Sequence, residues 1–212
     1  AQKIASYLDD EVRQLRESKP ALLEEMEHGT SPSRTKSILE GRYEVAHFFA
    51  ELLREIEGKL RSECPKVAEA VHENYEEEIG IRGYGTINGV AHEVGRKILM
   101  EAMGFNYEQW AASKGSLKKI GNIYDSTRGL LQTLLETVDG GNPLIISGMI
   151  AFYEWRISGF RKTIDSKEGH GEYVSLIKGM KQAFPQMSES TMQHLIDHAI
   201  HDRRHAEEFF TP

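Results

Sequence analysis

The sequence has a single cysteine, Cys64, among 212 residues, which excludes an internal disulfide bond. It also has no apolar run long enough to cross a bilayer: the longest, "PLIISGMIAFY" (Pro143 to Tyr153), has about half the roughly 20 residues required. The first residues, "AQKIASYLDDEVRQ", lack the basic and apolar regions of a secretory signal peptide. These absences favour a soluble protein of a reducing compartment, and we expect the cytoplasm and no membrane partner.

An excess of basic residues is missing too. The net charge is -7 and the isoelectric point is near 5.8, with Lys and Arg scattered among the acids. Because nucleic-acid phosphates are bound by a basic stripe, we expect no nucleic-acid partner. The chain contains neither Gly-x-Ser-x-Gly nor Gly-x4-Gly-Lys, and Cys64 has no obvious base beside it. A nucleophilic or nucleotide-binding enzyme is therefore disfavoured.

What the sequence does have is helical periodicity, with apolar residues three and four apart along nearly the whole chain. We therefore predict an all-α fold, a bundle of about seven to eight helices, in one domain over residues 1–212. A loop is expected from His28 to Thr35. The predicted helices are Ile4–Met26 with a break at Pro20, Lys36–Leu60, a helix opened by Pro65 and ended near "EIGIRGYGTIN", Gly89–Met103, Leu117–Val138 after an "ASKGS" linker, Pro143–Phe160, Glu172–Phe184 and Ser188–Phe210.

Four of the nine histidines lie in the last predicted helix, in "HLIDHAIHDRRHAEEFF" from His194 to Phe210. At roughly 100° per residue, His198, Asp202 and His205 fall beside the apolar face, whereas His194 and His201 fall farther from it. The spacing His-x3-Asp-x2-His puts three ligands on one helix edge and suits iron or zinc. The alternative is a stripe of surface histidines.

Helical phase also turns Glu78 inward, because it falls within about 20° of the apolar Val67. Glu76 and Glu77 are expected to be solvated. A carboxylate on a core face costs several kcal/mol unless it is paired or binds a metal. The other interpretation of Glu78 is a partly exposed residue in the last helical turn.

Two further candidates are Glu154 and His92. Glu154 is the only acid in a helix that is apolar almost all round, so it needs a metal or an arginine from another helix. A structural salt bridge is the alternative. His92 lies beside a predicted apolar stripe and could equally be a core histidine. That stripe consists of Ala91, Val94, Ile98 and Ala102.

Three Glu-x2-His matches, beginning at Glu25, Glu44 and Glu69, raise the ferritin-like pattern. Phase turns most of these side chains away from the core, so we reject that pattern. Glu44 lies on a flank and stays open as an additional ligand.

Taken together, the candidates resemble the haem-oxygenase-like di-iron oxidases and oxygenases, which are related in fold to thiaminase II and pyrroloquinoline-quinone synthase. "NYEEEIG" (Asn74 to Gly80) resembles the family's first ligand motif, with Glu78 as ligand, and "MIAFYE" resembles the segment that supplies Glu154. The glycine-rich segment before His92 is longer than is usual in the family. The resemblance implies a metal site formed by Glu78, His92, Glu154, His198, Asp202 and His205.

The resemblance further implies two Fe(II) ions, O2 as co-substrate and a small amino-acid-like, amine or carboxylate substrate. The implied reactions are N-oxygenation, oxidative C–C cleavage, desaturation or nitrile formation, in specialised metabolism. Arg203 falls within the core arc of the last helix and either pairs with a buried acid or binds a substrate carboxylate. A homodimer stays open. The alternatives are a metal-free thiaminase-like enzyme or cofactor-independent oxidase of the same fold, and a noncatalytic helical interaction module.

Overall fold

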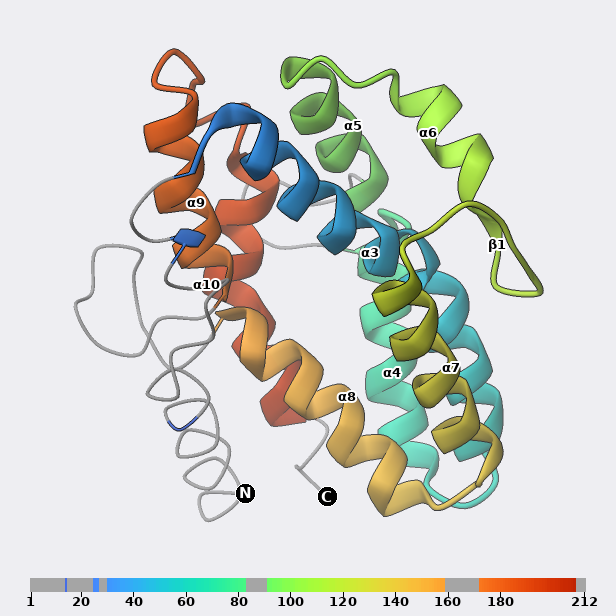
Figure 1. Ribbon diagram of the computed structural model, residues 1–212. Helices are drawn as coiled ribbons and strands as arrows, with labels where there is room; N and C mark the ends of the chain where they lie inside the picture. Colours follow the sequence, from blue (N-terminus) through green and yellow to red (C-terminus); the bar gives the residue numbers. More distant parts are fainter. Residues whose placement is uncertain (1–13, 15–24, 27–29, 83–90, 159–171, 209–212) are drawn as a thin grey trace. The chain divides into compact units, whose positions relative to one another are not determined.

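The computed structural model describes residues 14, 25–26, 30–82, 91–158 and 172–208 (Figure 1). Within these ranges the chain is predominantly helical, which confirms the all-α prediction, and no helix there has both the length and the apolar character needed to cross a membrane. The haem-oxygenase-like arrangement stays a prediction. The elements are α3 (Pro32–Leu60), α4 (Pro65–Glu78), α5 (His92–Ala102), α6 (Tyr107–Lys114), β1 (Gly115–Ser116), β2 (Lys119–Ile120), α7 (Asp125–Asp139), α8 (Pro143–Ser158), α9 (Glu172–Ala183) and α10 (Gln193–Glu208).

The chain divides into two compact units. Unit 1 comprises Ala1–Thr35 and Gly148–Pro212, and unit 2 comprises Lys36–Ser147. The boundaries fall inside α3 and inside α8. The single domain over 1–212 stays a prediction, and each unit is described by itself. The expected first helix, from Ile4 to Met26, lies almost entirely outside the described residues.

Helix α3 has the buried stripe that its sequence predicts, formed by Ile38, Val45, Phe49, Leu52, Leu53 and Ile56. Its start was predicted four residues too late, because the loop expected up to Thr35 already turns helical at Pro32. The reason is local: the Ser31 Oγ accepts from the Arg34 backbone N–H at 3.3 Å, and Pro32 occupies the favoured first helical position.

The segment between α5 and α7 was predicted wrongly. Helix α6 replaces an expected linker, and its cap is Asn106, whose side chain accepts from the Gln109 N–H at 3.0 Å. A short antiparallel hairpin, β1–β2, then replaces the start of the helix expected from Leu117, so α7 begins only at Asp125. Gly115 adopts φ 77°, a conformation that breaks α6 and starts the hairpin.

Helix α5 buries a different face from the one that its apolar residues predicted. Val94 and Ile98 are 46% and 50% exposed, so the expected stripe faces solvent within unit 2. The buried face consists of His92, Arg96, Leu99 and Met100. The prediction assigned the core to the side of α5 with the most apolar residues. The buried side instead includes two polar residues, His92 and Arg96.

In unit 1, α9 and α10 pack side by side (Figure 1). Gly179 allows the chain at Met26 to approach α9, since a Cβ at Gly179 would lie 2.5 Å from the Met26 carbonyl oxygen. Helix α10 buries Leu195 and Ala199 as its pattern predicts. The two helices provide the setting for the histidine motif.

Candidate metal centre

The last residue of α4 and the first residue of α5 form a buried pair in unit 2. Glu78 and His92 are 6% and 4% exposed, and His92 Nδ1 lies 2.8 Å from Glu78 Oε1. An ionised carboxylate only accepts hydrogen bonds, so Nδ1 carries the proton and Nε2 is the acceptor nitrogen of the ring. A carboxylate that orients an imidazole in this way is a common feature of protein metal sites. The inward orientation predicted for Glu78 is confirmed, whereas His92 is buried although the apolar stripe beside which it was placed is exposed.

Arg96 completes this group, which we call the Glu78 cluster (Glu78, His92 and Arg96). The Arg96 Nη1 donates to Glu78 Oε2 at 3.3 Å, and its side chain is buried. Burial opposes the charge on Arg96, but Glu78, Tyr107 and Tyr43 together outweigh burial, so the pKa of Arg96 is raised. Arg96 was missed by the sequence reasoning, although it lies four residues after His92 and therefore on the same face of α5.

Unit 1 contains a second imidazole–carboxylate pair, on α10. His198 Nδ1 lies 2.7 Å from Asp202 Oδ1, and Asp202 is buried. The ring of Tyr173 on α9 meets the His198 ring edge-on at 5.8 Å between centroids. We call His198 and Asp202 the α10 pair, and Tyr173 is its aromatic neighbour. The predicted inward orientation of His198 and Asp202 is confirmed.

The expectation for His194 was wrong. It was placed farther from the core, yet it is buried, and its ring lies 4.5 Å from that of His198 in an edge-on arrangement. Asp197 is buried as well, so burial on α10 extends beyond the arc of its apolar residues. Phase on a single helix cannot show how far neighbouring helices cover its polar side.

Glu154, on α8, is buried in unit 1 as predicted. The side chains of His205, Arg203 and His201 lie outside the described part of the chain, so their expected orientations stay predictions. Of the six predicted ligands, Glu78 and His92 therefore meet in unit 2, and His198 and Asp202 meet in unit 1.

Glu76 and Glu77 on α4 do not behave as predicted. Glu77 is fully buried rather than solvated. Glu76 is partly buried and pairs with Arg82 Nε at 2.7 Å. Helix α4 buries more than one side, which an assignment from a single apolar stripe does not detect.

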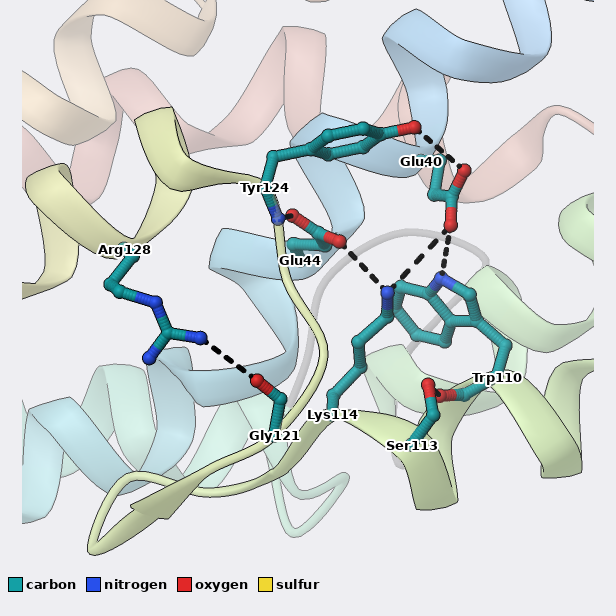
Figure 2. Close-up of polar contacts among 8 residues, drawn as sticks. All are labelled: Glu40, Glu44, Trp110, Ser113, Lys114, Gly121, Tyr124 and Arg128. Carbon is teal, nitrogen blue, oxygen red and sulfur yellow. Dashed lines mark hydrogen bonds and ion pairs between the residues drawn. The ribbon is translucent and has the colours of Figure 1, made fainter.

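Glu44, left open as an extra ligand, has other partners (Figure 2). It is 1% exposed, its Oε1 accepts from Lys114 Nζ at 2.8 Å, and its Oε2 accepts from the Tyr124 backbone N–H at 2.9 Å. We call Glu44, Lys114 and the Tyr124 amide the Glu44 cluster. Both oxygens receive donors that cannot bind a metal, so the cluster attaches the hairpin segment to α3. Lys114 was missed because nothing in "ASKGS" predicts a buried lysine.

No protein-family model matches the chain, and no curated protein sequence matches it. The family resemblance therefore stays a prediction that depends on the motifs. The donor set of each unit nevertheless fits ferrous iron, since each joins a buried carboxylate to an imidazole, the ligand types that suit this metal.

Proposed function

We propose that this chain is a non-haem di-iron oxidase or oxygenase that uses O2 on a small amino-acid-like, amine or carboxylate substrate. The observation that carries the proposal is that each of the two units has an imidazole paired with a buried carboxylate, at positions that the motifs selected. In this proposal, the irons are bound by Glu78, His92, Glu154, His198, Asp202 and His205.

The protein's own residues would prepare such a site in two ways. The Glu78 and Asp202 carboxylates hold the Nδ1 protons of His92 and His198, which leaves Nε2 as the coordinating nitrogen unless the metal replaces the hydrogen bond. Burial of these groups excludes water, which strengthens electrostatic interactions around the metal. When bound, two ferrous ions would supply the electrons that activate O2.

The proposed reaction is N-oxygenation, oxidative C–C cleavage, desaturation or nitrile formation, in the specialised metabolism of the cytoplasm. Product analysis chooses among these outcomes. Mass spectrometry after incubation with iron, reductant, O2 and a panel of amino acids, amines and fatty acids should show a mass gain for oxygenation and a loss of two hydrogens for desaturation.

Metal loading tests the proposal itself. After anaerobic incubation with Fe(II) and gel filtration, the wild type should retain two irons per chain, and His198→Ala and Asp202→Ala should retain fewer. His72→Ala is the matched control, because its half-exposed ring pairs with Glu57 at 3.2 Å and belongs to neither predicted ligand pair. A wild type without iron, or equal iron in all four proteins, would lead us to abandon the proposal.

A noncatalytic interaction module is the second candidate, and one observation favours it: Glu78 pairs with an arginine, as that alternative predicts. Against it, His194 is buried, whereas a pH-sensitive histidine surface requires exposed rings. NMR titration separates the two, since the module requires all four histidines of the motif to titrate as exposed groups.

A thiaminase-like enzyme needs a cysteine in its pocket. Cys64 caps the opposite end of α4 from Glu78, about 20 Å away along a helix that rises about 1.5 Å per residue. The geometry of unit 2 therefore gives this alternative no support at the Glu78 cluster.

A further inference from the structure

We propose that Tyr107, Trp110 and Tyr124 form an electron-transfer path from the protein surface to the Glu78 cluster. The path carries single electrons inward, so that an oxidant formed without bound substrate is reduced before it damages its own ligands. This inference rests on the proposed function, because that function supplies the oxidant.

The first half of the path is a series of buried contacts within unit 2. Arg96, which donates to Glu78, also interacts with the hydroxyl of Tyr107. The ring of Tyr107 lies 5.5 Å from that of Trp110, centroid to centroid, at an interplanar angle of 33°. Both rings are buried, and their spacing of three residues places them on the same face of α6.

The second half reaches solvent through one carboxylate (Figure 2). The Trp110 indole N–H donates to Glu40 Oε1 at 3.2 Å, and the Tyr124 hydroxyl donates to Glu40 Oε2 at 3.1 Å. Tyr124 is 44% exposed. Glu40 therefore joins a buried indole to a phenol at the surface.

Each aromatic group has a carboxylate that can take its proton when its electron leaves. Tyr107 interacts with Glu93, and Glu40 accepts from both Trp110 and Tyr124. A phenol that loses an electron becomes strongly acidic, so a nearby base lowers the cost of its oxidation. The three aromatic residues share this arrangement, which ordinary packing of rings does not require.

The position of Lys114 defines the state of the oxidised indole. Its ammonium lies 5.2 Å from the centre of the Trp110 ring. A cation over the ring is attracted to neutral indole and repelled by an indole radical cation. Trp110 would therefore be oxidised to the neutral radical, with its proton on Glu40.

The steps balance as follows. The O2-derived oxidant takes one electron from Tyr107, whose phenolic proton moves to Glu93. Trp110 then reduces Tyr107, which recovers its proton, and the indole proton moves to Glu40. Tyr124 then reduces Trp110: Glu40 returns the indole proton to Trp110 and accepts the phenolic proton of Tyr124. A small thiol or ascorbate in solution finally reduces Tyr124. Glu40 then returns the phenolic proton to Tyr124. The net change is one electron passed from the reductant to the oxidant, while the reductant releases its proton to solvent.

An iron-free experiment tests the path directly. In a Cys64→Ser background, Val94→Cys provides an exposed thiol on α5, two residues from both His92 and Arg96, for a ruthenium polypyridyl photosensitiser. A light flash with an electron acceptor creates Ru(III) there. Its reduction, followed by transient absorption, should slow at least several-fold when Trp110→Phe is added, and the radical detected by electron paramagnetic resonance should be on Tyr124 and be lost in Tyr124→Phe.

Tyr75→Phe is the matched control. Tyr75 is one turn from Glu78 on α4, but its ring stacks on Arg54, 4.9 Å away, and lies outside the path. The proposed path is overturned if Ru(III) is reduced at the wild-type rate in Trp110→Phe, or if Tyr75→Phe slows its reduction as much as Trp110→Phe does. Circular dichroism of each variant shows whether the fold is retained, and Trp110→Tyr, which keeps an oxidisable ring, should restore part of the rate.

A second arm separates this inference from the proposed function. Protein given Fe(II) and then O2 without substrate is digested, and oxidation at each peptide is measured together with iron content. Trp110→Phe should bind the same iron but show several-fold less oxidation at Tyr124 and more at His92. A protein that binds no iron but conducts in the flash experiment overturns the proposed function and leaves the path; bound iron with oxidation unaffected by Trp110→Phe overturns the path alone.

Discussion

Glu44 and Glu78 are both buried carboxylates of unit 2 with basic partners, and they differ in what those partners can do. Glu44 accepts from a lysine ammonium and from a backbone amide, and both donors lack a lone pair for a metal. Glu78 is held by an arginine and by the imidazole of His92, which can bind a metal. Burial of a carboxylate alone therefore does not indicate a metal site, and the chemistry of its partner decides.

The largest expected effect comes from breaking the Glu44 cluster. Glu44→Ala leaves the Lys114 ammonium buried without its closest counter-charge, which should cost about 3–5 kcal/mol of unfolding free energy. Urea denaturation of metal-free protein measures it. Glu108→Ala, which removes an exposed pair with Lys97, should change the unfolding free energy far less, because solvent screens exposed ion pairs. Equal losses in the two variants would contradict a structural role for Glu44.

Iron should stabilise the protein through the Glu78 cluster and not through the Glu44 cluster. At a free Fe(II) concentration about one hundred times Kd, binding to the native state alone adds about 2.7 kcal/mol. Anaerobic urea denaturation should show this gain in the wild type and in the double variant Glu44→Leu with Lys114→Met, whose apolar replacement of the ion pair restores most of the stability.

The matched variant is His92→Ala, which should lose most of the increase in unfolding free energy that Fe(II) gives the wild type. A gain that survives in His92→Ala, or that disappears in the double variant, would reverse the roles assigned to the two clusters.

The hairpin beside Lys114 gives a smaller effect. Gly115→Ala forces a side chain into φ 77° and brings its Cβ into a clash with the Lys119 carbonyl oxygen, so it should cost about 1–3 kcal/mol. Gly129→Ala, on the exposed face of α7 with no atom within 4 Å, should instead stabilise by about 0.5–1 kcal/mol. Thermal unfolding compares them, and a neutral Gly115→Ala would show that the hairpin does not hold Lys114 in place.

The smallest effect is expected at Glu57, a buried carboxylate of α3 outside both clusters. Burial opposes its ionisation, but hydrogen bonds from Arg61 and His72 outweigh burial and lower the pKa of Glu57. Its stabilising contribution is therefore present above the ordinary glutamate pKa of about 4.3, and is lost as the pH falls through the lower folded pKa. Urea denaturation should show wild type and Glu57→Gln converging in acid; a difference independent of pH would contradict this.

The sequence predicted the elements whose pattern is set by their own residues. The stripe of α3 and the inward Glu78 and Asp202 followed from periodicity, and the buried Glu154 followed from the apolar composition of its helix; all are confirmed. The failures share a cause: the exposure of Val94 and the burial of His194 depend on which polar residues find partners on neighbouring elements. Pattern on one helix contains no information on those partners.

The Glu44 cluster shows the same limit over a longer distance. Glu44 and Lys114 are 70 residues apart, and the ammonium reaches the carboxylate only because Asn106 caps α6 and Gly115 ends it. These local signals are readable in the sequence, but their three-dimensional consequence is not. The structural role of Glu44 and the metal role proposed for Glu78 therefore depend on the positions of partners that the sequence does not give.

Mössbauer spectroscopy tests the central claim most directly. Protein loaded anaerobically with isotopically enriched Fe(II) and freed of unbound metal should show two high-spin ferrous sites per chain, which convert on exposure to O2 into a coupled diferric spectrum. His198→Ala should lose at least one site. Retention of no iron after loading, or of iron that O2 leaves as isolated, uncoupled ions, would contradict a di-iron centre in this protein.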